Sequence, residues 1–177
     1  MNPNRLPKIA LSSIVLLGVV STVPSITRTG EIATANPASE AAAPTAAIFA
    51  EDGIAIRGTD PVAYFTEGRP VQGVQDYAYE WQGVTWLFAN AKHRDLFASN
   101  PEAYAPQYGG FCAYGVSQGA LVAIVPEAWA IVDGKLYLNF SADVQQLWQE
   151  DIPGYISQAN QTWPTLASKN AQSNLSY

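Results

Sequence analysis

Two side chains in this sequence have the chemistry to bind a metal ion or to react covalently: the single histidine, His93, and the single cysteine, Cys112. A neutral imidazole binds copper, zinc or iron, and a thiolate binds soft copper ions. The same two groups could act as a base and a nucleophile if the fold placed them within hydrogen-bond reach. The only methionine is Met1, so a metal site would need further ligands from Asp, Glu, Tyr or a second subunit.

Each of these two residues also has a structural interpretation. His93 falls in the first turn of a predicted helix, where a half-buried imidazole can bond to the neighbouring loop. Cys112 follows Gly109-Gly110 and is flanked by Phe111 and Ala113, and a free cysteine among apolar neighbours is usually a small buried hydrophobic residue. Two hypotheses therefore stay open for this pair, a copper site and two separate structural positions.

A third possibility is a cavity for a small apolar or aromatic ligand. Tyr64, Tyr108 and Tyr114 could line such a cavity with their rings and polar tips, although aromatic residues at these spacings also build ordinary cores. The sequence contains no nucleophile elbow, no glycine-rich phosphate loop and no paired carboxylates that we can place. We therefore expect a binding protein rather than an enzyme.

Strands and helices must position these residues, and the sequence predicts both. Two hairpins are indicated by Gln82-Gly83 and Asp133-Gly134, each flanked by alternating apolar residues. The aromatic residues of the first hairpin, among them Trp81, Trp86 and Phe88, are the expected centre of the core. The predicted extended segments cover 54–58, 62–65, 77–81, 84–88, 128–132 and 135–140.

Polar caps and prolines mark the predicted helices. Asn90 and Ser141 are expected to cap helix N-termini, and Pro101 begins a short helical turn. Gly109-Gly110 permits a sharp turn or a close approach of the backbone. The expected fold class is α+β, with a small antiparallel sheet of hairpins and short helices packed on it in a single domain. The predicted helices cover 91–97, 101–104, 142–150 and 153–160.

The N-terminal region has the pattern of a secretory signal. Arg5 and Lys8 precede an apolar run over 9–20, and Ala33-Thr34-Ala35 fits the small-x-small pattern for cleavage before Asn36. We expect an exported protein, periplasmic or extracellular, with no stable membrane span after cleavage. The predicted organisation is a signal peptide over 1–35, a low-complexity linker over 36–53, a folded domain over 54–166 and a polar tail over 167–177.

The charge of the chain excludes one class of partner. Arg5, Lys8, Arg28 and Glu31 precede Asn36, so the rest of the chain has six Lys and Arg residues against fourteen Asp and Glu residues. Binding to a phosphate backbone requires clustered cations. We therefore expect no nucleic-acid partner.

Several of these segments together resemble the YHS domain in its longer, exported bacterial form. The resemblance extends from about Ile54 to Leu166. The stretches that carry it are Gly58–Phe65, Trp86–Ala89, His93–Phe97, Asn100–Tyr104, Tyr104–Ala113 and Ile131–Asn139.

The resemblance implies a non-enzymatic binding protein. Short YHS domains are similar to heavy-metal-binding modules with three cysteines, and those cysteine positions fall on Ala63, Ala89 and His93 in this sequence. One implied ligand is therefore a transition metal such as copper, held by His93 with Cys112. The alanines remove two thiolates, which favours the alternative of a small-ligand cavity or a structural module without metal. A Cys112–His93 enzyme is a further alternative.

Overall fold

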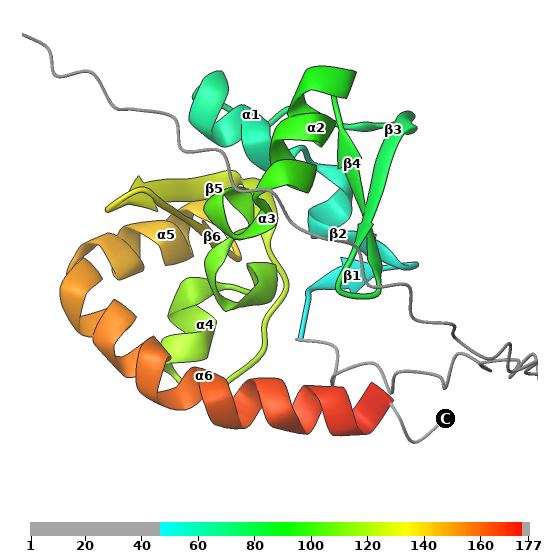
Figure 1. Cartoon of the computed structure of the whole chain (residues 1–177). Coiled ribbons are helices and arrows are strands. Elements are labelled where there is room, and N and C mark those ends of the chain that lie inside the picture. Colours follow the sequence, from blue (N-terminus) through cyan, green and yellow to red (C-terminus); the bar gives the residue numbers. More distant parts are fainter. Residues whose placement is uncertain (1–46, 175–177) are drawn as a thin grey trace, which may run out of the picture. The chain divides into compact units, whose positions relative to one another are not determined.

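Figure 1 shows the computed structural model of the chain, which describes residues 47–174. The predicted signal peptide over 1–35 and its cleavage site lie outside the described residues, as does the linker over 36–46. No helix within 47–174 has the length and apolar character needed to cross a membrane.

The described chain contains a four-stranded sheet and a separate two-stranded hairpin, so the predicted α+β class is confirmed. In the sheet the order is β1-β2-β4-β3, in which β2 runs parallel to β4 and the other pairs are antiparallel. The strands are β1 (Ala50–Glu51), β2 (Ile54–Ala55), β3 (Val74–Trp81), β4 (Val84–Phe88), β5 (Val125–Val132) and β6 (Lys135–Asn139).

Both predicted hairpins are confirmed, and the turn residues explain why they form. Gln82 and Gly83 have φ values of 52° and 76°, and Asp133 and Gly134 have φ values of 50° and 72°. Two successive positive φ angles define the tight turn whose twist matches that of antiparallel strands. Each hairpin is therefore specified by its own two-residue turn, between β3 and β4 and between β5 and β6.

Helices surround the strands. The predicted caps are confirmed: the side chain of Asn90 accepts a hydrogen bond from the His93 amide, and that of Ser141 accepts one from Val144. The α-helices are α1 (Pro61–Thr66), α2 (Ala91–Ser99), α3 (Pro101–Tyr104), α4 (Ala113–Ser117), α5 (Ala142–Gln149) and α6 (Ile152–Asn174), and the 3-10 helices are η1 (Ile56–Gly58) and η2 (Gln107–Gly110).

The extended segment that we expected over 62–65 is wrong, because this stretch is helix α1. Asp60 caps the helix, since its carboxylate accepts hydrogen bonds from the Val62 and Ala63 amides. Pro61 occupies the first helical position, where its missing N–H costs nothing. The strand expected over 54–58 also ends early, at Ala55, and continues as η1.

Both ends of the folded region extend beyond the predicted 54–166. Ala47 and Phe49, in the expected linker, belong to the buried core, and β1 begins at Ala50. At the other end α6 continues through Pro164 to Asn174. It lies along α4 in Figure 1, and Thr162 donates a hydrogen bond to the α4 carbonyl of Val116 at 2.6 Å.

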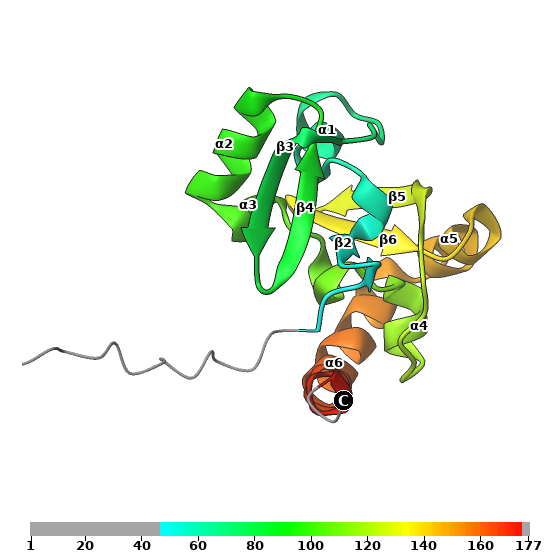
Figure 2. The ribbon, with the colours of Figure 1, turned by 90° about the vertical axis from the view of Figure 1, so that its right-hand side faces the viewer.

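An aromatic cluster fills the space between α2 and the β3–β4 hairpin. Phe97 of α2 lies at its centre, and the rings of Tyr79, Trp81, Trp86 and Phe88 surround it at centroid distances of 6.2, 5.6, 5.1 and 5.2 Å. Trp86 and Phe88 are fully buried, which confirms the expected aromatic core of the first hairpin. Figure 2 shows α2 and α3 on one side of this hairpin and the β5–β6 hairpin on the other.

Candidate functional site

Cys112 lies at the start of α4, buried against the end of β6. It is the N-cap of the helix, and its sulfur accepts a hydrogen bond from the Gly115 amide at 3.3 Å. The thiol also donates to Oδ1 of Asn139 over 3.7 Å. Burial raises the pKa of the Cys112 thiol, although the hydrogen bond from Gly115 acts in the opposite direction. The residue therefore presents a protonated, weakly polar sulfur.

A pocket of about 270 Å³ lies beside Cys112, which we call the Cys112 pocket. It is formed by α4, the loop that follows it, and the junction between β6 and α5. Its exposed lining is apolar, and the half-exposed ring of Phe140 extends this apolar surface toward solvent. The lining residues are Cys112, Tyr114, Gly115, Gln118, Ala120, Val122, Phe140 and Val144.

The three tyrosines proposed as a cavity lining occupy different places. Tyr64 is buried, and its hydroxyl donates to the Pro126 carbonyl at 3.0 Å. Tyr108 is also buried, and its hydroxyl donates to Asn160 Oδ1 at 3.1 Å. Burial raises the pKa of both phenols. Tyr114 alone lines the Cys112 pocket, so the structure brings together Cys112 and Tyr114 from the predicted set.

His93 takes part in a separate buried cluster around Asp60. Its Nδ1 lies 2.6 Å from Oδ2 of Asp60, and its Nε2 lies 3.3 Å from the hydroxyl of Thr66. Asp60 is fully buried and also accepts the amide of Ala89, so one carboxylate links the start of α1, the end of β4 and α2. Nothing in the sequence indicates that Asp60 pairs with His93, because the two residues lie 33 positions apart.

No hydrogen bond and no common partner connects His93 with Cys112 within residues 47–174. The same part of the chain contains no group of three or more His, Cys, Asp and Glu side chains that could hold a metal ion. The Cys112 thiol donates to an amide oxygen, that of Asn139, and the pocket beside it contains no His, Asp or Glu side chain that could complete a copper site. The observed contacts therefore give no support to a copper site shared by the two residues.

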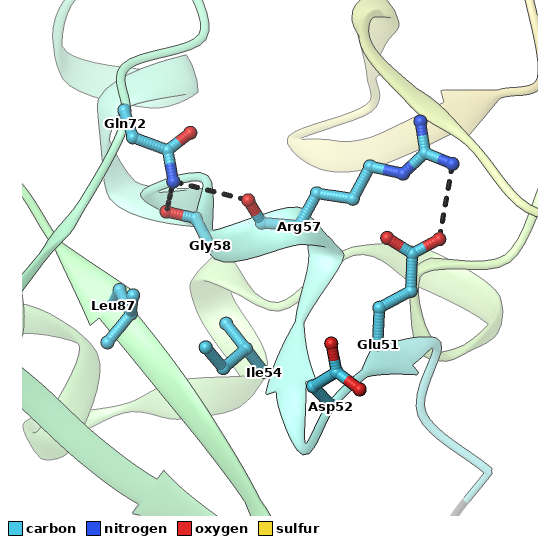
Figure 3. A pocket seen from close by; sticks show the side chains of 7 residues that line it. All are labelled: Glu51, Asp52, Ile54, Arg57, Gly58, Gln72 and Leu87. Atoms are coloured by element: carbon cyan, nitrogen blue, oxygen red, sulfur yellow. Dashed lines mark hydrogen bonds and ion pairs between the residues drawn. The ribbon is translucent and has the colours of Figure 1, made fainter.

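A second pocket, of about 480 Å³, lies beside the β1–β2 turn and was not predicted (Figure 3). The guanidinium of Arg57 pairs with Glu51 at 3.2 Å, and Gln72 donates to the Arg57 and Gly58 carbonyls at 3.2 and 3.1 Å. Both side chains of the ion pair are exposed, so their net attraction is small. The lining residues are Glu51, Asp52, Ile54, Arg57, Gly58, Gln72 and Leu87.

Comparison of the chain with family models, with curated proteins and with solved structures gave no significant match in any of the three. The candidate sites are therefore assessed by their own chemistry. Of the two pockets, the Cys112 pocket contains residues proposed from the sequence and has an apolar lining.

Proposed function

We propose that this chain is an exported, non-enzymatic binding protein of the YHS type, and that it binds a small apolar molecule in the Cys112 pocket. The observation that carries the proposed ligand class is the apolar lining of this pocket next to a buried, protonated thiol. Export and the family are proposed from the sequence, on the signal-like N-terminal pattern and the motif resemblance described above.

The dimensions of the pocket suggest the size of the ligand. Pockets for drug-sized ligands usually have volumes of about 300–1,000 Å³. At about 270 Å³, the Cys112 pocket suits a smaller molecule, such as a compound of two fused rings. Removal of apolar ligand surface from water would contribute about 25 cal/mol per Å² before the entropic cost of binding.

Binding of indole and naphthalene, measured by ligand-observed NMR, tests this proposal. The variant Ala120→Leu should weaken binding at least about tenfold, because the larger side chain fills space in the pocket while its exposed position spares the core. The matched control is Ala103→Leu, which changes an exposed alanine of α3 outside the pocket lining and should bind like the wild type. Equal binding by all three proteins, or no binding by the wild type, would contradict the proposal.

A second candidate function is copper binding at His93, and the Asp60–His93 hydrogen bond favours it. A carboxylate that accepts from one ring nitrogen of a histidine fixes the tautomer and directs the other nitrogen toward a metal. Here Asp60 engages Nδ1, so Nε2 would be the ligand atom and would exchange its contact with the Thr66 hydroxyl for the metal. Copper itself would supply the redox and Lewis-acid chemistry, whereas His93 would bind the ion and Asp60 would orient the imidazole ring.

Titration with Cu(I) and Cu(II) separates these candidates. Copper on His93 predicts that His93→Gln abolishes binding while Cys112→Ser keeps it, whereas a site shared by both residues predicts loss in both variants. Each variant must still unfold cooperatively on heating, so that a loss of copper binding is not caused by a loss of the fold. If the wild type binds neither ion tighter than about 10 μM, a level that surface groups can reach, the copper candidate is wrong.

A further inference from the structure

The strand β3 forms one edge of the four-stranded sheet, and within residues 47–174 its outer side has no partner strand. The strand order β1-β2-β4-β3 places β4 on one side of it, and Figure 1 shows β3 at the margin of the fold. A register shift between Val74 and Ala78 limits the regular ladder with β4 to residues 78–81. Every residue of β3 is exposed or half-buried, so solvent reaches the whole strand.

The hairpin turn determines which backbone groups of β3 point outward. In a tight turn the first carbonyl accepts the N–H of the fourth residue, so Trp81 and Val84 form a hydrogen-bonded pair. Such pairs alternate along an antiparallel ladder. Tyr79 therefore also bonds to β4, whereas Ala78 and Glu80 direct their N–H and C=O groups away from it. Within the described chain no other group bonds to the backbone of these two residues.

The β5–β6 hairpin supports this assignment and shows an edge that is closed. The same alternation, counted from the turn at 133–134, directs the C=O group of Trp129 out of the hairpin. That carbonyl accepts a hydrogen bond from the side chain of Gln145, and the Pro126 carbonyl of the same strand accepts the Tyr64 hydroxyl. Side chains therefore occupy outward groups of β5, whereas those of β3 are available to a partner.

Negative charge marks the open edge of β3. Its charged residues are Asp76 and Glu80, both exposed, and β4 has no charged residue. The Thr85 hydroxyl donates to the Glu80 carboxylate, and Asp76 has no ion pair within residues 47–174. The chain from Asn36 onward also has an excess of acidic residues. The edge therefore attracts cationic partners.

We propose that the edge of β3 binds an extended segment of a partner protein that is rich in lysine or arginine, and that this segment adds a strand beside Ala78 and Glu80. Its backbone would bond to their outward groups, and a cationic side chain would lie opposite Glu80. A second copy of this chain fits less well, because another β3 would bring the same carboxylates to within one strand spacing. The edge contact does not depend on the Cys112 pocket.

The hexapeptide Lys-Val-Lys-Val-Lys-Val, acetylated and amidated, tests this proposal in NMR titrations of the ¹⁵N-labelled full chain. We expect the amide protons of Ala78 and Glu80 to move downfield and to exchange more slowly with water, whereas those of Tyr79 and Trp81 already bond to β4 and should change less. Glu80→Lys should weaken binding about tenfold, because an attractive cross-strand pair becomes repulsive. The matched control is Glu127→Lys, which reverses an exposed acidic residue of β5 and should bind like the wild type.

Two further peptides separate strand addition from attraction between charges. Glu-Val-Glu-Val-Glu-Val has the same backbone and should bind at least about tenfold more weakly. The lysine peptide N-methylated at every residue keeps its charge but cannot donate backbone hydrogen bonds, so it should also bind more weakly. Equal binding of either peptide and the lysine peptide would overturn the proposal, as would no binding by the wild type.

Two other results would also contradict a cationic partner at this edge. Equal losses in Glu80→Lys and Glu127→Lys would show that the peptide does not bind beside Glu80. Slow exchange of the Ala78 and Glu80 amides in a dimer of the chain alone would show that a second copy occupies the edge. The peptide comparison on the wild type decides even if Glu80→Lys does not fold.

Discussion

Replacement of Asp60 by alanine should destabilise the domain far more than the loss of a helix cap does. The carboxylate is fully buried and accepts hydrogen bonds from the amides of Val62, Ala63 and Ala89 and from Nδ1 of His93, at 2.9, 3.3, 2.9 and 2.6 Å. Two of these donors belong to the first turn of α1. The other two belong to the end of β4 and to α2, so alanine would disconnect three elements at once.

The magnitude follows from these contacts. Loss of the α1 cap costs about 1 kcal/mol. The Ala89 amide and His93 Nδ1 lose their acceptor, and each buried unpaired donor costs about 1–3 kcal/mol. We therefore expect Asp60→Ala to lower the free energy of unfolding by about 3–7 kcal/mol. The total stability of such a domain is about 5–15 kcal/mol.

Urea unfolding followed by tryptophan fluorescence measures this loss. The matched control is Ser141→Ala, because Ser141 caps α5 and, within residues 47–174, its side chain accepts only the Val144 amide, so about 1 kcal/mol should be lost. Asp60→Asn should fall between the two: the amide oxygen can still cap α1, but the new NH₂ group would face the Ala89 amide. A loss for Asp60→Ala no larger than that for Ser141→Ala would refute the linking role of Asp60.

Three further predictions concern other parts of the fold. Trp86→Ala should cost about 3–5 kcal/mol and abolish soluble expression, since the ring is fully buried; a wild-type yield and melt would contradict this. Above about pH 8.5 the Cys112 thiol ionises in the unfolded state, whereas its raised pKa keeps it protonated in the folded state. The free energy of unfolding, measured by urea titration, should therefore fall with pH more steeply in the wild type than in Cys112→Ser, by up to about 1.4 kcal/mol per pH unit. Gly109→Ala should have a much lower melting temperature than Gly119→Ala. Both glycines have positive φ, but a Cβ at 109 would lie 1.8 Å from the Ala47 carbonyl oxygen, whereas a Cβ at 119 would meet nothing within 4 Å. Equal melting temperatures would show that the close contact at Gly109 does not exist.

Features that depend on neighbouring residues could be predicted from the sequence. Asn90 and Ser141 cap their helices through amides three residues ahead, and the two hairpins turn at adjacent residues, so the signal and the structure occupy the same short stretch. The segment over 62–65 shows the limit of this reasoning. Four apolar residues fit a strand or a buried helix equally well, and only the cap at Asp60 decides for the helix.

Features that depend on tertiary packing could be predicted only in part. Cys112 and Tyr114 were candidates because of their chemistry, but Val122, Phe140 and Val144 have ordinary apolar side chains and gain their position only when α4 packs near α5. The continuation of α6 past Pro164 has a similar cause. Trp163 packs its ring 5.9 Å from that of Tyr108, and this tertiary contact holds the helix beyond a residue that usually ends one.

His93 and Asp60 show why residue type alone did not decide between a ligand and a structural group. His93 alone could be a metal ligand or a structural group, and nothing in the sequence pairs it with Asp60, because 33 residues separate them and no local period connects them. Once paired, the two interpretations become one: a buried carboxylate that holds an imidazole is both a structural link and the arrangement that prepares a histidine to bind a metal. Asp60→Ala and copper titration therefore examine the same hydrogen bond, the first through its contribution to folding and the second through Nε2, the ring nitrogen that contacts the Thr66 hydroxyl.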